Sequence, residues 1–124
     1  MKAARIARGT AARVSGRRGE VLAVLMLMLK GYRILGFRLK TPQAEIDILA
    51  LKGGALIAVE VKRRTSLLAA LEAVSFDQRQ RLRRAATNLA ARRPSLAGAS
   101  VRLDLVALAP GRLPVHIPDA WKGA

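Results

Sequence analysis

The chain has 124 residues, of which 23 are Lys or Arg and 8 are Asp or Glu, so its formal net charge is +15. That length fits one domain, and a hydrophobic content of 52% is enough for a buried core. These residues include no Cys and one His, which excludes disulfides, Cys-type zinc sites and sites built on several His. A metal held here would be a hard ion with oxygen ligands, such as Mg²⁺ or Mn²⁺.

The positive charge predicts a polyanionic partner, and most of the basic residues are Arg, whose planar guanidinium suits phosphate. Charge alone leaves two classes of partner open, nucleic acid and an anionic membrane surface. A transmembrane helix is not expected, because the apolar run Val21–Leu29 is far shorter than the roughly 20 residues that span a bilayer.

Residues 1–16 are basic and rich in Ala, and we interpret them as a flexible basic arm; a solvated tail without a specific role is the alternative. The following residues 17–124 are expected to form a single domain. Arg17-Arg18 before an apolar run is similar to a twin-arginine export signal, but Glu20 lies at its start and no cleavage site follows. We therefore favour a cytoplasmic protein in which residues 17–30 form a well-buried helix that ends at Gly31.

Three strand-like runs follow this helix. The first, Tyr32–Leu39, contains Gly36 as a candidate bulge. The runs Glu45–Leu51 and Ala55–Val61 are separated by Gly53-Gly54, which suits a two-residue type I′ hairpin.

A long helix is predicted from Leu67 or Leu71 to Arg93, where Pro94 ends it. Strands are predicted at Ser100–Leu108 and Val115–Ile117. The order α-β-β-β-α-β predicts an α/β fold in which helices flank a central mixed β-sheet.

Carboxylates occupy both strands of the predicted hairpin. If Gly53-Gly54 form the turn, Asp47 lies opposite Glu60, and Glu45 lies opposite Lys62. Facing carboxylates repel, and such pairs destabilise a sheet unless a cation lies between them. A divalent metal is one explanation, with Lys62 stabilising charge during catalysis. The other is a solvent-facing strand pair that happens to carry these residues, since the E-x-K pattern is short and common.

This arrangement of Asp47, a hairpin and Glu60-Val61-Lys62 resembles the PD-(D/E)xK core of restriction-endonuclease-like folds. The whole chain resembles the YraN family of uncharacterised bacterial proteins. The matching stretches are Arg18-Gly19-Glu20, Gly31-Tyr32, Glu45-Ile46-Asp47-Ile48-Leu49-Ala50, Val59-Glu60-Val61-Lys62-Arg63-Arg64, Arg102-Leu103-Asp104-Leu105-Val106 and Ile117-Pro118-Asp119-Ala120-Trp121.

The resemblance implies a restriction-endonuclease-like fold and a catalytic site with Mg²⁺ or Mn²⁺. Asp47, Glu60 and Lys62 would be its catalytic residues. The implied metal ligands are Asp47, Glu60, Glu20 and the carbonyl of Val61. Two positions depart from the family pattern: Ala44 stands where Gly is usual, and Gln78 where Lys is usual. The role of Gln78 is therefore left open between a residue that faces the active site and a polar residue of the helix surface. The role of Glu45, in the strand that carries Asp47, is also left open.

The function that follows is that of a nucleic-acid-binding protein and candidate metal-dependent endonuclease, with DNA, branched or structured, as the expected substrate. The residues expected to hold its backbone are Arg63, Arg64, Arg79, Arg83 and Arg84. A homodimer is compatible with the resemblance, although the sequence locates no interface. The alternatives are an inactive nucleic-acid-binding module and a basic assembly protein at a ribosome or membrane surface.

Three further residues are given structural roles. Asp104 is expected to pair with Arg102 or another Arg, because buried acids are usually paired. Trp121 is interpreted as a packing residue, and His116 as an ordinary residue of the surface or of an edge strand.

Overall fold

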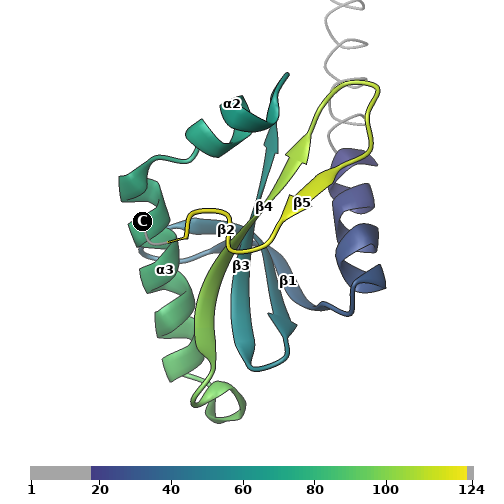
Figure 1. Cartoon of the computed structure of the whole chain (residues 1–124). Coiled ribbons are helices and arrows are strands. Elements are labelled where there is room, and N and C mark those ends of the chain that lie inside the picture. The colour runs from purple at the N-terminus through teal and green to yellow at the C-terminus, as the bar shows by residue number, and fades with distance from the viewer. Residues whose placement is uncertain (1–17, 123–124) are drawn as a thin grey trace, which may run out of the picture.

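The computed structural model describes residues 18–122, which form a five-stranded mixed sheet with helices on both faces (Figure 1). The strands are β1 (Arg33–Lys40), β2 (Glu45–Lys52), β3 (Ala55–Arg63), β4 (Ser100–Leu108) and β5 (Val115–Ile117). They lie in chain order across the sheet; β3 and β4 are parallel, and the other neighbours are antiparallel. The predicted α/β class is confirmed, while residues 1–16, interpreted as a basic arm, lie outside the described residues.

Each face of the sheet has its own hydrophobic core. On one face, α3 (Phe76–Ala91) packs Leu82, Ala85 and Ala86 against residues such as Leu49, Leu56, Leu103 and Leu105. On the other face lies the helix formed by residues 18–29, here called the N-terminal helix. It packs Ala23 and Leu27 against Ile57, Val59 and Val106.

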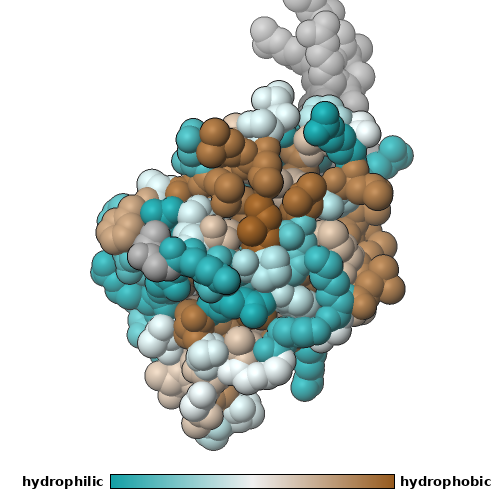
Figure 2. All heavy atoms as spheres, in the orientation of Figure 1, coloured by the Kyte–Doolittle hydropathy of each residue, from teal (hydrophilic) through white to brown (hydrophobic). Residues whose placement is uncertain are grey.

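The N-terminal helix ends where predicted but is less buried than predicted. Gly31 takes a φ of 87°, the left-handed conformation that commonly ends a helix. Only a narrow stripe faces the sheet, so Val21, Leu22, Leu25 and Met28 are about half exposed and Leu29 is 89% exposed. Figure 2 shows this apolar surface at the right-hand side, where the helix lies in Figure 1. Among the described residues, no helix is long and apolar enough to cross a membrane.

The long helix predicted after β3 is two helices, α2 (Leu67–Glu72) and α3, with a break at residues 73–75. The break has a local cause, because the Ser75 hydroxyl accepts a hydrogen bond from the Gln78 amide at 3.1 Å and caps a new helix. Ser75 with Gln at the third helical position is a capping pattern that the sequence displays. After α3, Pro94–Leu96 form a short 3₁₀ turn, η1.

The β2–β3 hairpin has the predicted register but a different turn. Ile48 pairs with Val59 and Lys52 pairs with Ala55, which confirms that Gly53-Gly54 are the two turn residues. Gly53 alone has a positive φ, 57°, so the turn is not type I′, which requires positive φ at both central residues. In β1, the register with β2 shifts between Ile34 and Gly36, at the predicted bulge.

Strand β2 changes its orientation at Asp47. Ile46 belongs to the core beneath α3, whereas Ile48 belongs to the core beneath the N-terminal helix. In a regular strand the alternation of side chains would put Ile46 and Ile48 on one face, as the sequence pattern predicts, and here they lie on opposite faces. Pairing with β3 ends at Ile48, before the expected Asp47–Glu60 and Glu45–Lys62 pairs. Such an interruption avoids a regular ladder in which two carboxylates directly oppose each other.

A buried polar cluster around Asp104 joins the sheet to the end of the N-terminal helix. The Asp104 carboxylate accepts hydrogen bonds from Arg102 Nε (2.8 Å), the Tyr32 hydroxyl (2.7 Å) and the Asp119 amide (3.0 Å). This confirms the expected pairing with Arg102. His116 is also part of the cluster: its side chain is fully buried and its Nε2 lies 2.8 Å from Asp104 Oδ2.

His116 lies on the edge strand β5, as one part of its interpretation expected, but it is not an ordinary surface residue, because its side chain is buried. Lys30 Nζ lies 3.0 Å from His116 Nδ1, and an ammonium group can only donate. Nδ1 therefore accepts, and the hydrogen on Nε2 faces Asp104. Trp121 is a packing residue as expected: it is buried, and its Nε1 donates to the Leu71 carbonyl at 3.2 Å.

We predict that Asp104→Asn lowers the free energy of unfolding at pH 7 by about 3 kcal/mol, because it removes the charge that compensates Arg102. Burial would raise the pKa of Asp104, but hydrogen bonds from His116, Arg102, Asp119 and Tyr32 outweigh burial and hold it well below its usual range. A lowered folded-state pKa stabilises the protein above the unfolded-state pKa, and this contribution is lost as the pH falls below about 4.

Urea unfolding of both proteins across this pH range measures the effect. The control is Asp77→Asn, which removes an exposed pair with Arg81 and changes stability by less than about 1 kcal/mol. Equal stability of Asp104→Asn and the unmodified chain at pH 7 would contradict the role assigned to the cluster.

Candidate metal centre and the pocket beside it

Two carboxylates meet where the β2–β3 pairing ends. Asp47 Oδ2 accepts a hydrogen bond from the Val61 amide at 2.9 Å, which fixes the side chain of one strand to the backbone of the next. Glu60, the residue before Val61, is only 2% exposed. The sequence therefore predicted correctly that the hairpin brings these acids together, although a side-chain contact replaces the expected strand pair.

One oxygen of Glu60, Oε1, is buried and has no hydrogen-bond partner among the described residues. Burial and then the charge of Asp47 raise the pKa of Glu60 to about 8, against the opposing effect of Lys62. Burial also raises the pKa of Asp47, while the Val61 amide and Lys62 act against the rise. The protein alone thus disfavours two negative charges here.

A divalent cation fits this donor set. Hard cations such as Mg²⁺ take carboxylate oxygens, and an orphaned Glu60 oxygen beside Asp47 is a ligand without a partner. Within residues 18–122, no three His, Asp or Glu side chains gather closely enough to hold a metal by themselves. Mg²⁺ usually keeps several waters and binds one or two protein carboxylates, so the pair is sufficient for that ion.

Lys62 lies close to both acids. It is partly buried, and its charge lowers the pKa of Asp47 and of Glu60. The strand thus supplies a cation beside the two carboxylates from the position predicted by the E-x-K pattern. The ligand role of the Val61 carbonyl stays a prediction, while its amide orients Asp47.

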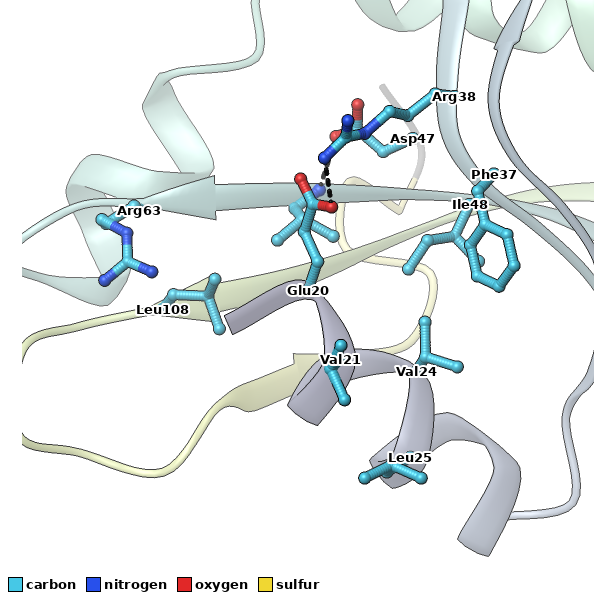
Figure 3. Close-up of a pocket in the computed structure, with 11 residues that line it drawn as sticks. Glu20, Val21, Val24, Leu25, Phe37, Arg38, Asp47, Ile48, Arg63 and Leu108 are labelled. Atoms are coloured by element: carbon cyan, nitrogen blue, oxygen red, sulfur yellow. Dashed lines mark hydrogen bonds and ion pairs between the residues drawn. The ribbon is translucent and has the colours of Figure 1, made fainter. Parts of the chain in front are cut away.

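Glu20 approaches the site from the N-terminal helix, but its contact is with an arginine. Arg38 of β1 donates from a terminal guanidinium nitrogen to Glu20 Oε2 at 2.6 Å, and Figure 3 shows its guanidinium between Glu20 and Asp47. Arg38 has a φ of 47°, which is rare for a residue with a side chain. Nothing in the sequence pattern marks Arg38 as a residue of the site. Glu20 as a metal ligand remains a prediction.

A pocket of about 600 Å³ opens next to Asp47, between the N-terminal helix and the sheet (Figure 3). Its wall is mainly apolar; Figure 3 shows Arg38 paired with Glu20 at one side of the pocket and Arg63 near Leu108 at the other. The lining residues are Glu20, Val21, Val24, Leu25, Phe37, Arg38, Asp47, Ile48, Val61, Arg63 and Leu108. The exposed apolar face of the helix therefore continues into the neighbourhood of the candidate metal centre.

The other predicted residues are more widely spread. Arg63 lines the pocket, and Arg64 is exposed and donates to the Arg63 carbonyl at 2.7 Å. Arg79 packs its guanidinium over the rings of Phe76 and Trp121, at 5.7 and 5.6 Å, which gives it a structural role. Their contacts with nucleic acid stay predictions.

Four further predicted residues lie in α3 or at the start of β2. Arg83 and Arg84 lie in α3, partly buried and exposed, respectively. Gln78 lies in the first turn of α3, and Glu45 pairs with Lys40 at the exposed start of β2. The structure does not bring Glu45 opposite Lys62 through strand pairing.

We predict that, without metal, Glu60→Gln is more stable than the unmodified chain above about pH 5. The pKa of Glu60 rises from 4.5 to about 8 on folding, so its contribution is most favourable below 4.5 and is lost as the pH rises through this window. The advantage of Glu60→Gln should grow by up to about 1.4 kcal/mol per pH unit between these values.

Thermal unfolding in EDTA from pH 4 to pH 9 measures this difference. Glu72→Gln, on the exposed side of α2, is the control and should follow the unmodified chain at every pH. If the difference in melting temperature between Glu60→Gln and the unmodified chain does not change with pH, the pKa of Glu60 is not raised on folding.

Comparison with known proteins places the chain in a family. Residues 19–108 match the model described as "Uncharacterised protein family UPF0102", the YraN family. A UPF0102 protein of Caulobacter sp. (strain K31) is 67% identical over 115 residues, which cover 93% of this chain and 83% of the relative. UPF0102 proteins of Caulobacter vibrioides (strain NA1000 / CB15N) and Parvibaculum lavamentivorans are 64% and 49% identical; the alignments cover 97% and 94% of this chain and 96% and 87% of the relatives. The chain therefore belongs to the UPF0102 family.

Proposed function

We propose that this protein is a metal-dependent nuclease of the PD-(D/E)xK type, which hydrolyses phosphodiester bonds in nucleic acid. The observation that supports the proposal most strongly is the buried Glu60 carboxylate, with an oxygen that lacks a partner, held beside Asp47 and Lys62. Burying two adjacent carboxylates is unfavourable unless a proton or a cation is shared between them, and a divalent cation would allow both to be ionised. The restriction-endonuclease-like character of the fold is part of this proposal.

The chain's own residues divide the work of the reaction. Asp47 and Glu60 hold the metal ion, which when bound lowers the pKa of a water and polarises the phosphate. The Val61 amide keeps the Asp47 carboxylate in place at 2.9 Å. Lys62 stabilises the negative charge that develops on the phosphate oxygens as the attacking oxygen approaches.

The basic surface supplies the affinity for the substrate. A net charge of +15 attracts a polyanion, and Arg63 and Arg64 follow directly after the candidate catalytic residues on β3. Contacts of this kind bind phosphates without regard to base sequence. DNA with a branched or structured form is the substrate class we propose, by analogy with junction resolvases of the same fold class.

We predict that the purified chain cleaves plasmid or branched DNA in Mg²⁺ or Mn²⁺, and that Asp47→Asn or Glu60→Gln lowers the rate at least about 100-fold. Both substitutions remove a metal ligand. Gel assays of cleavage and calorimetric titration with Mn²⁺ measure the two consequences separately, with Glu72→Gln as the control.

The proposal fails if the unmodified chain binds DNA but cleaves none of several DNA and RNA substrates and shows no binding of Mn²⁺. The protein would then be a binding module of the same fold. If the unmodified chain binds Mn²⁺ and the two variants do not, the metal centre is supported even when none of the tested substrates is cleaved.

We predict that binding of DNA weakens steeply with salt, and that Arg63→Gln and Arg64→Gln each reduce the slope of log K against log salt by roughly 1. Each substitution removes one phosphate contact. Fluorescence anisotropy at several salt concentrations gives the slopes. Arg33→Gln, at the opposite end of the β1–β2 ladder from the candidate site, should leave the slope unchanged. A flat salt response of the unmodified chain would contradict phosphate binding.

A further inference from the structure

The pocket beside Asp47 has a wall that phosphate binding does not explain. Phosphate contacts require cations and hydrogen-bond donors, whereas the larger part of this wall is apolar side chains such as Val21, Leu25 and Phe37. Exposing such a wall to water is unfavourable, and a contiguous exposed apolar surface commonly marks a binding site. The occupant is therefore expected to present an apolar surface within reach of the carboxylates.

We propose that the pocket receives the base of one unpaired nucleotide, next to the phosphate that Asp47 and Glu60 address. This inference rests on the proposed nuclease function and specifies its substrate class: nucleic acid with a base outside a regular duplex. A stacked and paired base offers only its edges in the grooves, so a protein pocket can enclose it only after the base leaves the stack.

The shape and chemistry of the pocket match such a ligand. Its volume of about 600 Å³ lies within the roughly 300–1,000 Å³ of pockets that take small organic molecules. Phe37 lines the wall with a ring that is 55% exposed, and exposed aromatic rings of this kind are the platforms on which single-stranded bases stack.

The net charge of the chain, +15, favours nucleic acid over a second copy of this chain as the occupant. Two arginines, Arg38 and Arg63, and two acids, Glu20 and Asp47, belong to the lining. Figure 3 shows Arg38 paired with Glu20. A nucleotide combines a base, whose faces would contact the apolar wall, with a phosphate, which would contact an arginine of the lining. A second copy of this chain would bring its own net charge of +15 against the same surface.

Equilibrium binding of the full chain to two DNA duplexes tests the inference. Both carry the fluorescent base 2-aminopurine, in one within a short unpaired stretch and in the other fully paired. EDTA prevents cleavage, so the measurement does not depend on turnover. We expect the unpaired DNA to bind at least roughly 5-fold more tightly, with a change in 2-aminopurine emission, because stacking on Phe37 is added to phosphate contacts.

Matched variants at exposed aromatic positions sharpen the test. Phe37→Leu should abolish the preference for unpaired DNA, whereas Phe37→Trp, which retains an aromatic face, should keep it. Phe76→Leu removes a similarly exposed ring on α3 (58% exposed) and should leave the preference unchanged. Circular dichroism confirms that each variant is folded.

Equal affinity for the two duplexes, or a preference that Phe37→Leu leaves intact, would overturn the inference. A change in oligomeric state on Phe37→Leu without a change in preference would also overturn it, in favour of a protein partner. If the chain cleaves DNA but shows no preference for unpaired DNA, only the proposed nucleotide pocket is refuted. If the preference is observed but the chain neither cleaves DNA nor binds Mn²⁺, the nuclease function is refuted and the nucleotide pocket is retained.

Discussion

The arrangement of the site depends on one hydrogen bond, from the Val61 amide to the Asp47 carboxylate. It forms where the β2–β3 pairing has ended and where β2 changes the face to which its side chains point. At the same position Asp47 lies next to Glu60, which is buried and has a raised pKa. A sheet that continued regularly would oppose the two acids directly, and like charges in that position repel. The irregularity thus accommodates a carboxylate pair in which burial and mutual repulsion disfavour two negative charges.

Contacts at both ends of the N-terminal helix hold that helix against the sheet next to Asp47 and Glu60. The Asp104 cluster fixes Tyr32 and His116 beneath the end of the N-terminal helix, so the helix is tied to β4 and β5. At the other end of that helix, a side chain added at Gly19 would lie 2.6 Å from Leu108, so the helix approaches the sheet closely there. Between these two attachments the helix leaves its apolar side open, and that side forms one wall of the pocket beside Asp47.

Much of this organisation was predictable from the sequence, because the relevant signals are local. Strand periodicity gave β4 and β5 with their observed bounds, and Gly53-Gly54 gave the hairpin register that places Asp47 near Glu60. The break before α3 also has a local signal, because Ser75 and Gln78 form a helix-capping pattern. The burial of His116, the exposure of the N-terminal helix and the position of Arg38 depend on tertiary packing. No periodicity encodes them, since each results from elements that are distant in the chain.

The proposed metal centre requires that Asp47 and Glu60 are ligands of one divalent ion. Anomalous diffraction from a crystal of the full chain soaked in Mn²⁺ would locate that ion. We expect one anomalous peak about 2.0–2.4 Å from a carboxylate oxygen of each residue, a range typical of oxygen ligands to divalent ions. We also expect the peak to be lost in Glu60→Gln. A crystal with Mn²⁺ bound elsewhere and no peak between these two residues would show that they do not form a metal centre.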